Sequence, residues 1–421
     1  MKAAVTTARI IVGLLFIFSG LVKANDPLGL SYKMQEFFDL WGMSEFNSWT
    51  LLMSVLMNAF EIIAGFALLL GWRIKLFSWL LLLLIIFFTF LTGYAYLSGK
   101  FKNCGCFGDC LPITPFTSFL KDLLLLALII FIFWKRKLIK PLFQEKATTI
   151  SMFVITVLSF GVQWYALTYL PFVDCLPFKK GKNITKQMEM PANAVPDRVI
   201  ITYEYLKDAT VSIFPIDSVP KELNKKEFLF VKKDSTEVDS VTFKKIMVYR
   251  KAGTGVSARF TSEKFPDDFT TSNYKYILLN KDEDKIEGKN NQPPIKGFDL
   301  KGVTGEDSTG IILNQPYAVL LFCENFSVPV SKWEKCFSKL FTELKAKNIP
   351  AYLVTSRPGE AGEKISKTPF AGLQILTCDY TAIKTAARTN PCIYFLKAGT
   401  IVDKQSFRKL NSIIAAVKKL P

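Results

Sequence analysis

Three cysteines fall within seven residues of one loop, and their spacing favours chemistry over packing. The loop reads NCGCFGDCLP over residues 103–112 and places Cys104, Cys106 and Cys110 between two long apolar runs. Its glycines let the backbone turn tightly enough for neighbouring thiols to approach one another. A partly exposed thiol just before a helix N-terminus can ionise and react. The pattern predicts thiol–disulfide chemistry at a membrane surface, with a structural disulfide that pins the loop as the alternative.

A fourth cysteine, Cys175, follows the last apolar run. We expect it on the same face of the membrane as the loop, where it relays electrons or resolves a mixed disulfide. The candidate catalytic residues are Cys104, Cys106, Cys110 and Cys175. Four thiolates also match a zinc site in number, but Cys-x-Cys is unusual ligand spacing and an oxidising compartment favours disulfides. We therefore predict no metal.

The chain has no histidine among its 421 residues. A Ser-His-Asp triad, a Cys-His pair, a His-ligated haem and a His-containing zinc site are all excluded. Chemistry in this protein must depend on Cys, Asp, Glu, Lys or Tyr, or on a bound organic cofactor.

Half of the residues are hydrophobic and the net charge is +17. The long apolar runs lie before residue 172, and the remainder has the composition of a soluble protein. The basic charge belongs to the flanks of membrane helices and to scattered lysines. No basic patch is interleaved with stacking aromatics, so we expect no nucleic-acid partner.

Five apolar runs approach the roughly 20 residues that cross a bilayer. They are Thr7–Val22, Leu51–Leu70, Leu76–Leu97, Phe119–Trp134 and Thr149–Leu170. The intervening residues 24–49 form a loop rich in Trp, Phe and Met, suited to the lipid–water interface.

With five spans, the strongest basic flanks all fall on one side of the membrane. These flanks are Lys2, Arg9, Arg73, Lys75 and the cluster at 135–140. The positive-inside rule makes that side the cytoplasm. We predict a multi-pass protein of the bacterial inner membrane whose cysteine loop, Cys175 and C-terminal half face the oxidising periplasm.

Glu61 lies inside the second apolar run, where a carboxyl group is costly and marks a functional site by default. Asn58 is one turn away, and Lys23 can reach it from the first span. Two interpretations stay open: a polar contact that fixes the bundle, or a proton or ligand site, including one for transport.

The membrane half resembles known families. Residues 9–23 and 58–71 are similar to the first two helices of the DoxX family of four-helix membrane proteins. The Cys-Gly-Cys-Phe-Gly motif at 104–108 is similar to the related MauE group. This resemblance covers about residues 5–140 and implies a four-helix bundle with a role in disulfide formation in an exported protein.

The overall layout also resembles bacterial vitamin K epoxide reductase homologues. Those have a four-helix bundle, a fifth span and an external thioredoxin-like domain, with a quinone as electron acceptor. That resemblance makes a membrane quinone the candidate cofactor. The chain departs from the pattern because it has no Cys-x-x-Cys.

The soluble half divides into a β-rich part and an α/β part. Strand–helix alternation after residue 291 resembles a thioredoxin fold, with Pro391 at the position of its cis-proline and Cys392 beside it. Cys323 stands alone where the family dithiol belongs. Pairs between Cys323 and Cys336, or Cys378 and Cys392, are open alternatives to free buried thiols.

The predicted fold class is therefore multi-domain: a helical membrane bundle, a fifth span, a β-rich subdomain and a thioredoxin-like domain. The predicted boundaries are 1–146, 147–172, 173–290 and 291–421. The predicted function is thiol–disulfide redox or disulfide formation at the periplasmic face, with a membrane quinone as the candidate electron acceptor. The expected partners are the lipid bilayer and a periplasmic partner or substrate protein. The alternative is a non-catalytic membrane scaffold whose periplasmic domain binds a partner.

Overall fold

The computed structural model describes residues 1–99, 105, 108–111, 113–195 and 291–420, together with the backbone of the strands between 198 and 286. Two compact units divide the chain. One comprises Met1–Glu189 with Pro294–Pro421, and the other comprises Met190–Pro293. The membrane helices and the α/β domain thus share one unit.

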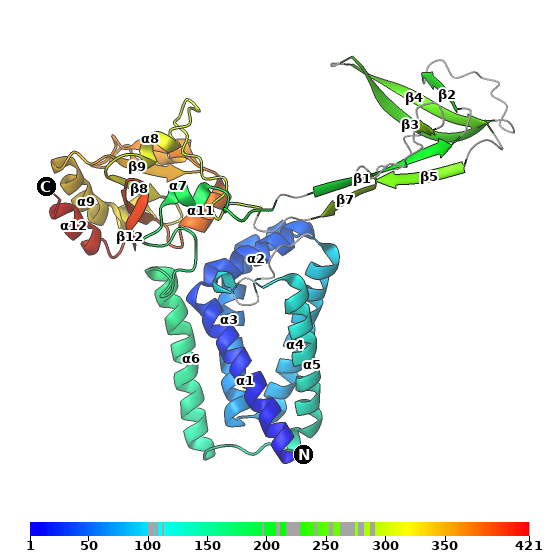
Figure 1. Cartoon of the computed structure of the whole chain (residues 1–421). Coiled ribbons are helices and arrows are strands. Elements are labelled where there is room, and N and C mark those ends of the chain that lie inside the picture. Colours follow the sequence, from blue (N-terminus) through cyan, green and yellow to red (C-terminus); the bar gives the residue numbers. More distant parts are fainter. Residues whose placement is uncertain are drawn as a thin grey trace. The chain divides into compact units, whose positions relative to one another are not determined.

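Five helices are long and apolar enough to cross a membrane, and Figure 1 shows them running alongside one another. They are α1 (Lys2–Asn25), α3 (Thr50–Leu70), α4 (Ile74–Ser98), α5 (Pro115–Lys135) and α6 (Glu145–Thr168). Each predicted apolar run overlaps one of them, which confirms the helical membrane part of the predicted fold class. The fifth begins four residues earlier than predicted, at Glu145.

Helices α1 and α3 pack closely because small residues face each other. A Cβ atom on Gly65 would lie 2.8 Å from the carbonyl oxygen of Gly13 and 3.0 Å from the amide nitrogen of Ile17. Any larger side chain would push the helices apart. The close contact fixes the depth at which polar groups of α1 meet those of α3.

The segment predicted as a loop at 24–49 is largely helical. It contains α2 (Pro27–Leu40) and the short helix η1 (Ser44–Trp49). Asp26 caps α2, since its side chain accepts a hydrogen bond from the amide of Gly29, and Pro27 occupies the first turn. Short helices η2 (Gly108–Cys110) and η3 (Arg136–Leu138) flank α5.

The α/β domain is built on a five-stranded sheet of order β10-β9-β8-β11-β12. Its strands are β8 (Ala318–Phe322), β9 (Ala351–Thr355), β10 (Gln374–Thr377), β11 (Cys392–Lys397) and β12 (Thr400–Ser406). β8, β9 and β10 are parallel, whereas β11 and β12 are antiparallel to their neighbours. The Asn390–Pro391 peptide bond is cis and immediately precedes β11. This order with this cis-proline is the thioredoxin-like arrangement predicted from the sequence.

Two apolar cores cover the faces of this sheet. Leu320 and Tyr394 belong to one, and Leu321 and Ile393 to the other, because successive strand residues point to opposite faces. The helices of the domain are α7 (Ile184–Met188), α8 (Thr309–Leu313), α9 (Glu334–Ala346), α10 (Pro358–Ile365), α11 (Tyr380–Ala386) and α12 (Asn411–Lys418), with η5 (Val330–Lys332) before α9.

The polar stretch at 179–193 was predicted as a linker, but much of it belongs to the thioredoxin-like domain. Phe178 and Ile184 are fully buried in the core that contains Tyr394. The amides of Ile184 and Gly181 donate to the carbonyl oxygens of Gly399 and Ile401. The β-rich unit is therefore inserted into this domain.

The inserted unit contains two antiparallel sheets. One pairs β1 (Arg198–Lys207) with β5 (Val256–Thr261), β6 (Tyr274–Tyr276) and β7 (Asp282–Ile286), and the other has the order β2 (Val211–Pro215), β4 (Thr242–Lys251), β3 (Phe228–Asp239). Sequence periodicity found four of these strands. It missed β5, β6 and β7, the last of which lies in the stretch taken as a boundary.

Candidate functional site

A disulfide joins Cys110 to Cys175 across 65 residues of sequence, with the two Cα atoms 4.9 Å apart. Cys110 ends η2, just before α5, and Cys175 follows α6. Both residues are half-buried, so the bridge remains open in part to solvent. The structure thus brings together two of the four predicted site cysteines. Cys104 and Cys106 lie outside the described residues.

The turn that carries Cys110 depends on glycine. Gly105 adopts a φ of 70°, which glycine reaches without a Cβ penalty, and a Cβ there would lie 3.1 Å from Cγ of Lys33. The amide of Gly108 donates to the carbonyl oxygen of Gly105 at 3.0 Å. Beyond the turn, Thr114 caps α5 by accepting from the amide of Thr117.

Cys175 is held by contacts on both sides in sequence. The side chain of Asn25 at the end of α1 makes two hydrogen bonds with the backbone of Val173, of 3.0 and 2.8 Å. Asp174 accepts from the amide of Leu176 and pairs with Lys404 of β12 at 2.9 Å. Cys175 is therefore fixed to both the membrane helices and the thioredoxin-like domain.

This pairing bears on the zinc alternative. A disulfide sulfur is not the thiolate that zinc requires. Two of the four sulfurs of the considered zinc site are joined to each other, so that alternative loses half of its ligands in this state. The prediction of no metal remains a prediction.

The predicted intramembrane residues form two separate contacts. Lys23 of α1 makes a salt bridge with Glu61 of α3, and their side chains are 3% and 1% exposed. Asn58, one turn before Glu61, donates to Gln163 of α6 at 3.2 Å. The three predicted polar residues therefore connect α3 to two different helices, α1 and α6. Gln163 was missed, although an amide in an apolar run was its signal.

Asp122 of α5 is a second buried carboxylate. The fourth span was predicted from Phe119, but α5 begins at Pro115, so Asp122 lies a full turn deeper in the helix and is 1% exposed. It accepts from Thr92 of α4 at 3.0 Å and pairs with Lys121 at 2.5 Å. A cavity of about 20 Å³ separates Asp122 from Glu61, with both carboxylates in its lining.

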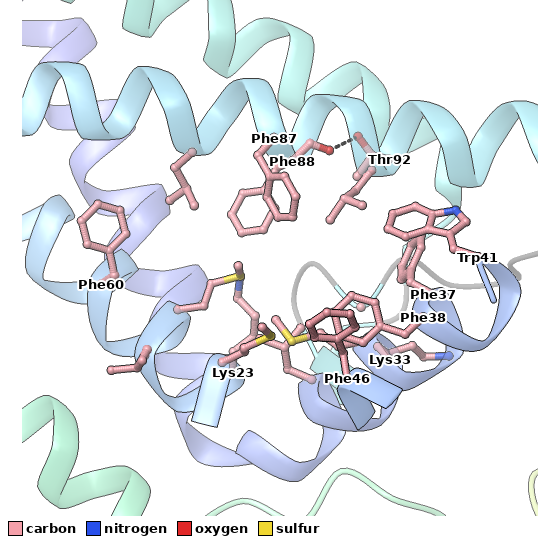
Figure 2. A pocket seen from close by; sticks show the side chains of 18 of the residues that line it. Lys23, Lys33, Phe37, Phe38, Trp41, Phe46, Phe60, Phe87, Phe88 and Thr92 are labelled. Atoms are coloured by element: carbon pink, nitrogen blue, oxygen red, sulfur yellow. Dashed lines mark hydrogen bonds between the residues drawn. The ribbon is translucent and has the colours of Figure 1, made fainter. Parts of the chain in front are cut away.

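A larger cavity of about 690 Å³ lies among α2, α3 and α4. Figure 2 shows its aromatic lining, with Phe87 and Phe88 on one side and Phe46 and Trp41 on others, and with Lys23 pointing into the space. No local sequence pattern signals it, because its lining comes from several successive elements, from Lys23 at the end of α1 to Gly105 after α4.

The thioredoxin-like domain holds four free cysteines. The alternatives that paired Cys323 with Cys336 and Cys378 with Cys392 are therefore not realised. Burial raises the pKa of Cys392 to about 11 and that of Cys378 to about 12. Burial, together with Cys392, raises the pKa of Cys323 further. Those three thiols are poor nucleophiles at neutral pH, whereas Cys336 is exposed.

Charged contacts tie the thioredoxin-like domain to the membrane domain beside α2. Arg388, which is 4% exposed, pairs with Asp26 at 2.7 Å. Lys384 donates to Gln35 at 2.7 Å. Glu324, the residue after Cys323, accepts from Tyr32 of α2 at 3.4 Å. The domain edge where a thioredoxin dithiol would lie is thus turned toward its own membrane domain.

Comparison with known proteins covers parts of the chain. Residues 1–135 match the family described as methylamine utilisation protein MauE. Protein TlpB of Flavobacterium psychrophilum is 25% identical over 234 residues, which are 52% of this chain and 57% of that protein. The chain thus spans little more than half the length of that curated relative.

Two solved structures of yeast Sco1 also show similarity. The copper-bound form is 16% identical and covers 30% of this chain and 92% of that one, with a TM-score of 0.24. The other form is 17% identical and covers 30% and 94%, with a TM-score of 0.23. From the matched membrane segment, the five apolar helices and the sheet order with its cis-proline, this protein is a MauE-like, multi-pass membrane protein that carries a thioredoxin-like domain.

Proposed function

We propose that this protein exchanges disulfides with the thiols of a partner protein at the periplasmic face of the bacterial inner membrane. One observation carries the proposal: Cys110 of the half-buried Cys110–Cys175 disulfide follows Cys104 and Cys106 in one short stretch of sequence. A disulfide that serves only as a staple does not need further thiols beside it in the sequence. We assign Cys104 and Cys106 to the relay of electrons from that bridge.

The exchange balances as two thiolate attacks. A partner thiolate attacks one sulfur of the Cys110–Cys175 bridge, a mixed disulfide forms, and the other sulfur leaves as a thiolate. A second partner thiolate then attacks the partner sulfur of the mixed disulfide, and the protein's cysteine leaves as a thiolate. The partner gains a disulfide, and Cys110 and Cys175 gain two electrons and two protons. Restoring the bridge needs a two-electron acceptor, for which a membrane quinone is our candidate.

The proposed orientation is supported by where the basic groups gather. Arg9 donates to the carbonyl oxygen of Leu69 at 2.5 Å and to that of Lys140 at 3.5 Å. The basic start of α1, the end of α3 and the segment after α5 therefore meet at one end of the bundle. Positive charge favours the cytoplasmic side, which leaves the disulfide for the periplasm.

Redox titration of the full-length protein tests the proposal. The protein is equilibrated in thiol buffers of defined potential, alkylated and mapped by mass spectrometry. We expect half-reduction of the Cys110–Cys175 bridge at a potential above about −300 mV, where exchanging disulfides lie. A bridge that stays oxidised below about −300 mV is structural and contradicts the proposal. The variant Cys336→Ser removes the exposed thiol that would otherwise obscure the labelling.

A second candidate function is a membrane scaffold whose soluble part binds a partner. The specific observation in its favour is the thioredoxin-like domain, which has three buried thiols and an edge held on α2 by Arg388 and Lys384. The same titration separates the two functions. A further test replaces one bridge cysteine, as Cys110→Ser or Cys175→Ser. If such a variant captures a partner as a mixed disulfide, exchange is favoured. If the partner still binds after both cysteines are replaced, the scaffold is favoured.

A further inference from the structure

The large cavity in the membrane domain is not needed for the exchange step itself. Its volume of about 690 Å³ falls in the range of about 300–1,000 Å³ typical of small-molecule sites. Helices α2, α3 and α4 supply a lining dominated by aromatic, leucine and methionine side chains. Such a lining suits a flat, apolar ligand with few polar atoms.

Among the described residues, two lysines line this cavity: Lys33, which pairs with Glu36 at 2.9 Å, and Lys23, which forms its buried polar end. Lys23 is 3% exposed, and its ammonium nitrogen lies 5.0 Å from the centroid of the Phe88 ring. An ammonium carries three N–H donors, and Glu61 accepts one of them. Figure 2 shows Lys23 directed into the cavity opposite Phe87 and Phe88. A ligand with a carbonyl oxygen at this end would meet a donor that is already desolvated.

The cavity also borders the cysteine loop. Gly105 contributes to its lining, and the amide of Gly108 donates to the carbonyl oxygen of Gly105. Gly108 begins η2, which ends in Cys110 of the disulfide. The hydrogen bond between Gly108 and Gly105 therefore links the cavity lining to the short helix that carries Cys110.

We propose that this cavity binds the ring of an isoprenoid quinone, with Lys23 donating to a ring carbonyl oxygen and the aromatic side chains enclosing the ring. This inference rests on the proposed function, because a quinone is useful here only if the thiols must lose electrons. When Cys110 and Cys175 are re-oxidised, two S–H bonds break and one S–S bond forms. The ring takes up the two electrons and two protons and becomes a quinol.

A lipid acyl chain would fill the same apolar space without using the polar end. It has no acceptor for Lys23, so its binding would be insensitive to the Lys23–Glu61 pair. A ring with carbonyl oxygens would depend on that pair. The difference between the two occupants is therefore measurable.

Binding can be measured apart from redox chemistry. The full-length protein with Cys104, Cys106, Cys110 and Cys175 all changed to Ser is placed in nanodiscs and titrated calorimetrically with decylubiquinone, with menaquinone-4 and with decylbenzene. We expect saturable binding of at least one quinone. Decylbenzene, which has the chain but no carbonyl, should bind at least tenfold more weakly.

Two variants in the same background locate the site. Leu84→Trp fills the cavity and should weaken quinone binding at least tenfold, whereas Leu83→Trp, at a neighbouring position 58% exposed and outside the lining, should not. The double change of Lys23 and Glu61 to Met removes the pair without leaving one buried charge. This double variant should bind a quinone no more tightly than it binds decylbenzene.

The outcomes distinguish this inference from the proposed function. Equal binding to all variants, or equal binding of quinone and decylbenzene, means that lipid-like partition fills the cavity and overturns the inference. Site-specific binding combined with a bridge that stays oxidised below about −300 mV supports the cavity and contradicts the exchange function. A bridge that is reduced above about −300 mV, combined with no specific quinone binding, supports the exchange function and overturns the inference about the cavity.

Discussion

The two sulfur-bearing regions of this protein differ in how accessible their sulfurs are. At the membrane end, Cys110 and Cys175 are half-buried and joined to each other. In the thioredoxin-like domain, Cys323, Cys378 and Cys392 are free and buried, and burial raises the pKa of each thiol. The fold associated with redox chemistry thus holds the less reactive thiols.

This difference teaches that a fold alone does not place a reactive group. A reactive thiol must be both ionised and accessible, and the thioredoxin-like domain withholds both conditions from Cys323, Cys378 and Cys392. What the domain does supply is attachment. Its β12 residue Lys404 pairs with Asp174, the neighbour of Cys175, so the domain helps to hold the membrane-end sulfur in place.

The largest expected effect comes from removing the bridge. The double variant Cys110→Ser, Cys175→Ser should lose disulfide exchange completely and be destabilised by about 4 kcal/mol, because a cross-link across 65 residues restricts the unfolded chain. Chemical unfolding and the oxidation of a dithiol peptide measure both effects. Cys378→Ser is the control, and loss of exchange in that variant would erase the contrast between the regions.

The attachment of the two domains should be the next largest effect. Arg388→Met leaves the Asp26 carboxylate, which is only 14% exposed, without its partner and should cost about 3 kcal/mol, measured by unfolding and by limited proteolysis. The double variant with Asp26→Asn should recover much of that loss. Arg357→Met is the matched control, because its pair with Glu360 is exposed and should contribute about 0–1 kcal/mol. Equal losses in both variants would show that the Arg388 contact does not hold the domains together.

Alkaline pH should weaken the thioredoxin-like domain through its buried thiols. The fold raises the pKa of Cys392 from 9.0 to about 11, so the folded state keeps a proton that the unfolded state loses. The stabilisation that the protonated Cys392 thiol gives the folded state is complete below pH 9. As the pH rises toward 11, the free energy of unfolding falls by about 2–3 kcal/mol. Unfolding curves of the protein and of Cys392→Ala between these pH values measure it. If the free energy of unfolding depends on pH in the same way in Cys392→Ala as in the original protein, Cys392 is not shielded from water as described.

The smallest effects concern helix caps in the two regions. Thr114 caps α5 at the membrane end, and Asp379 caps α11 in the thioredoxin-like domain. Replacing either residue with Ala should cost about 1 kcal/mol, because an amide at the helix start loses its acceptor. Only Thr114→Ala should also change the reduction potential of the Cys110–Cys175 bridge. A shift of the reduction potential in both variants would mean that the bridge responds to a general loss of stability.

Local properties of the chain were accessible from the sequence. An apolar run long enough to cross a bilayer is visible without any partner, and so are strand–helix alternation and a proline placed before a strand. The five spans, the helical bundle and the thioredoxin-like arrangement followed from these features. Strands in the inserted unit were harder, since β6 and β7 are short and polar and lack alternating apolar residues.

The candidate site was only partly accessible. Cys110 and Cys175 could be named as thiols of interest, but four cysteines allow several pairings, and Cys104 and Cys106 lie outside the described residues. Lys23 and Glu61 could be named as a pair because Glu61 is a charge inside an apolar run and Lys23 directly follows another. Asp122 was not among the candidate site residues, since its depth depends on where α5 begins.

The sequence by itself determined that this protein crosses a membrane, carries clustered cysteines at one boundary and has no histidine chemistry. The tertiary structure alone decided that Cys175 meets Cys110, that Asn58 turns to Gln163, and that Ile184 fills the core of a distant domain. The reason is that composition and periodicity report what each segment prefers. Contacts across many tens of residues depend on how all the segments pack together.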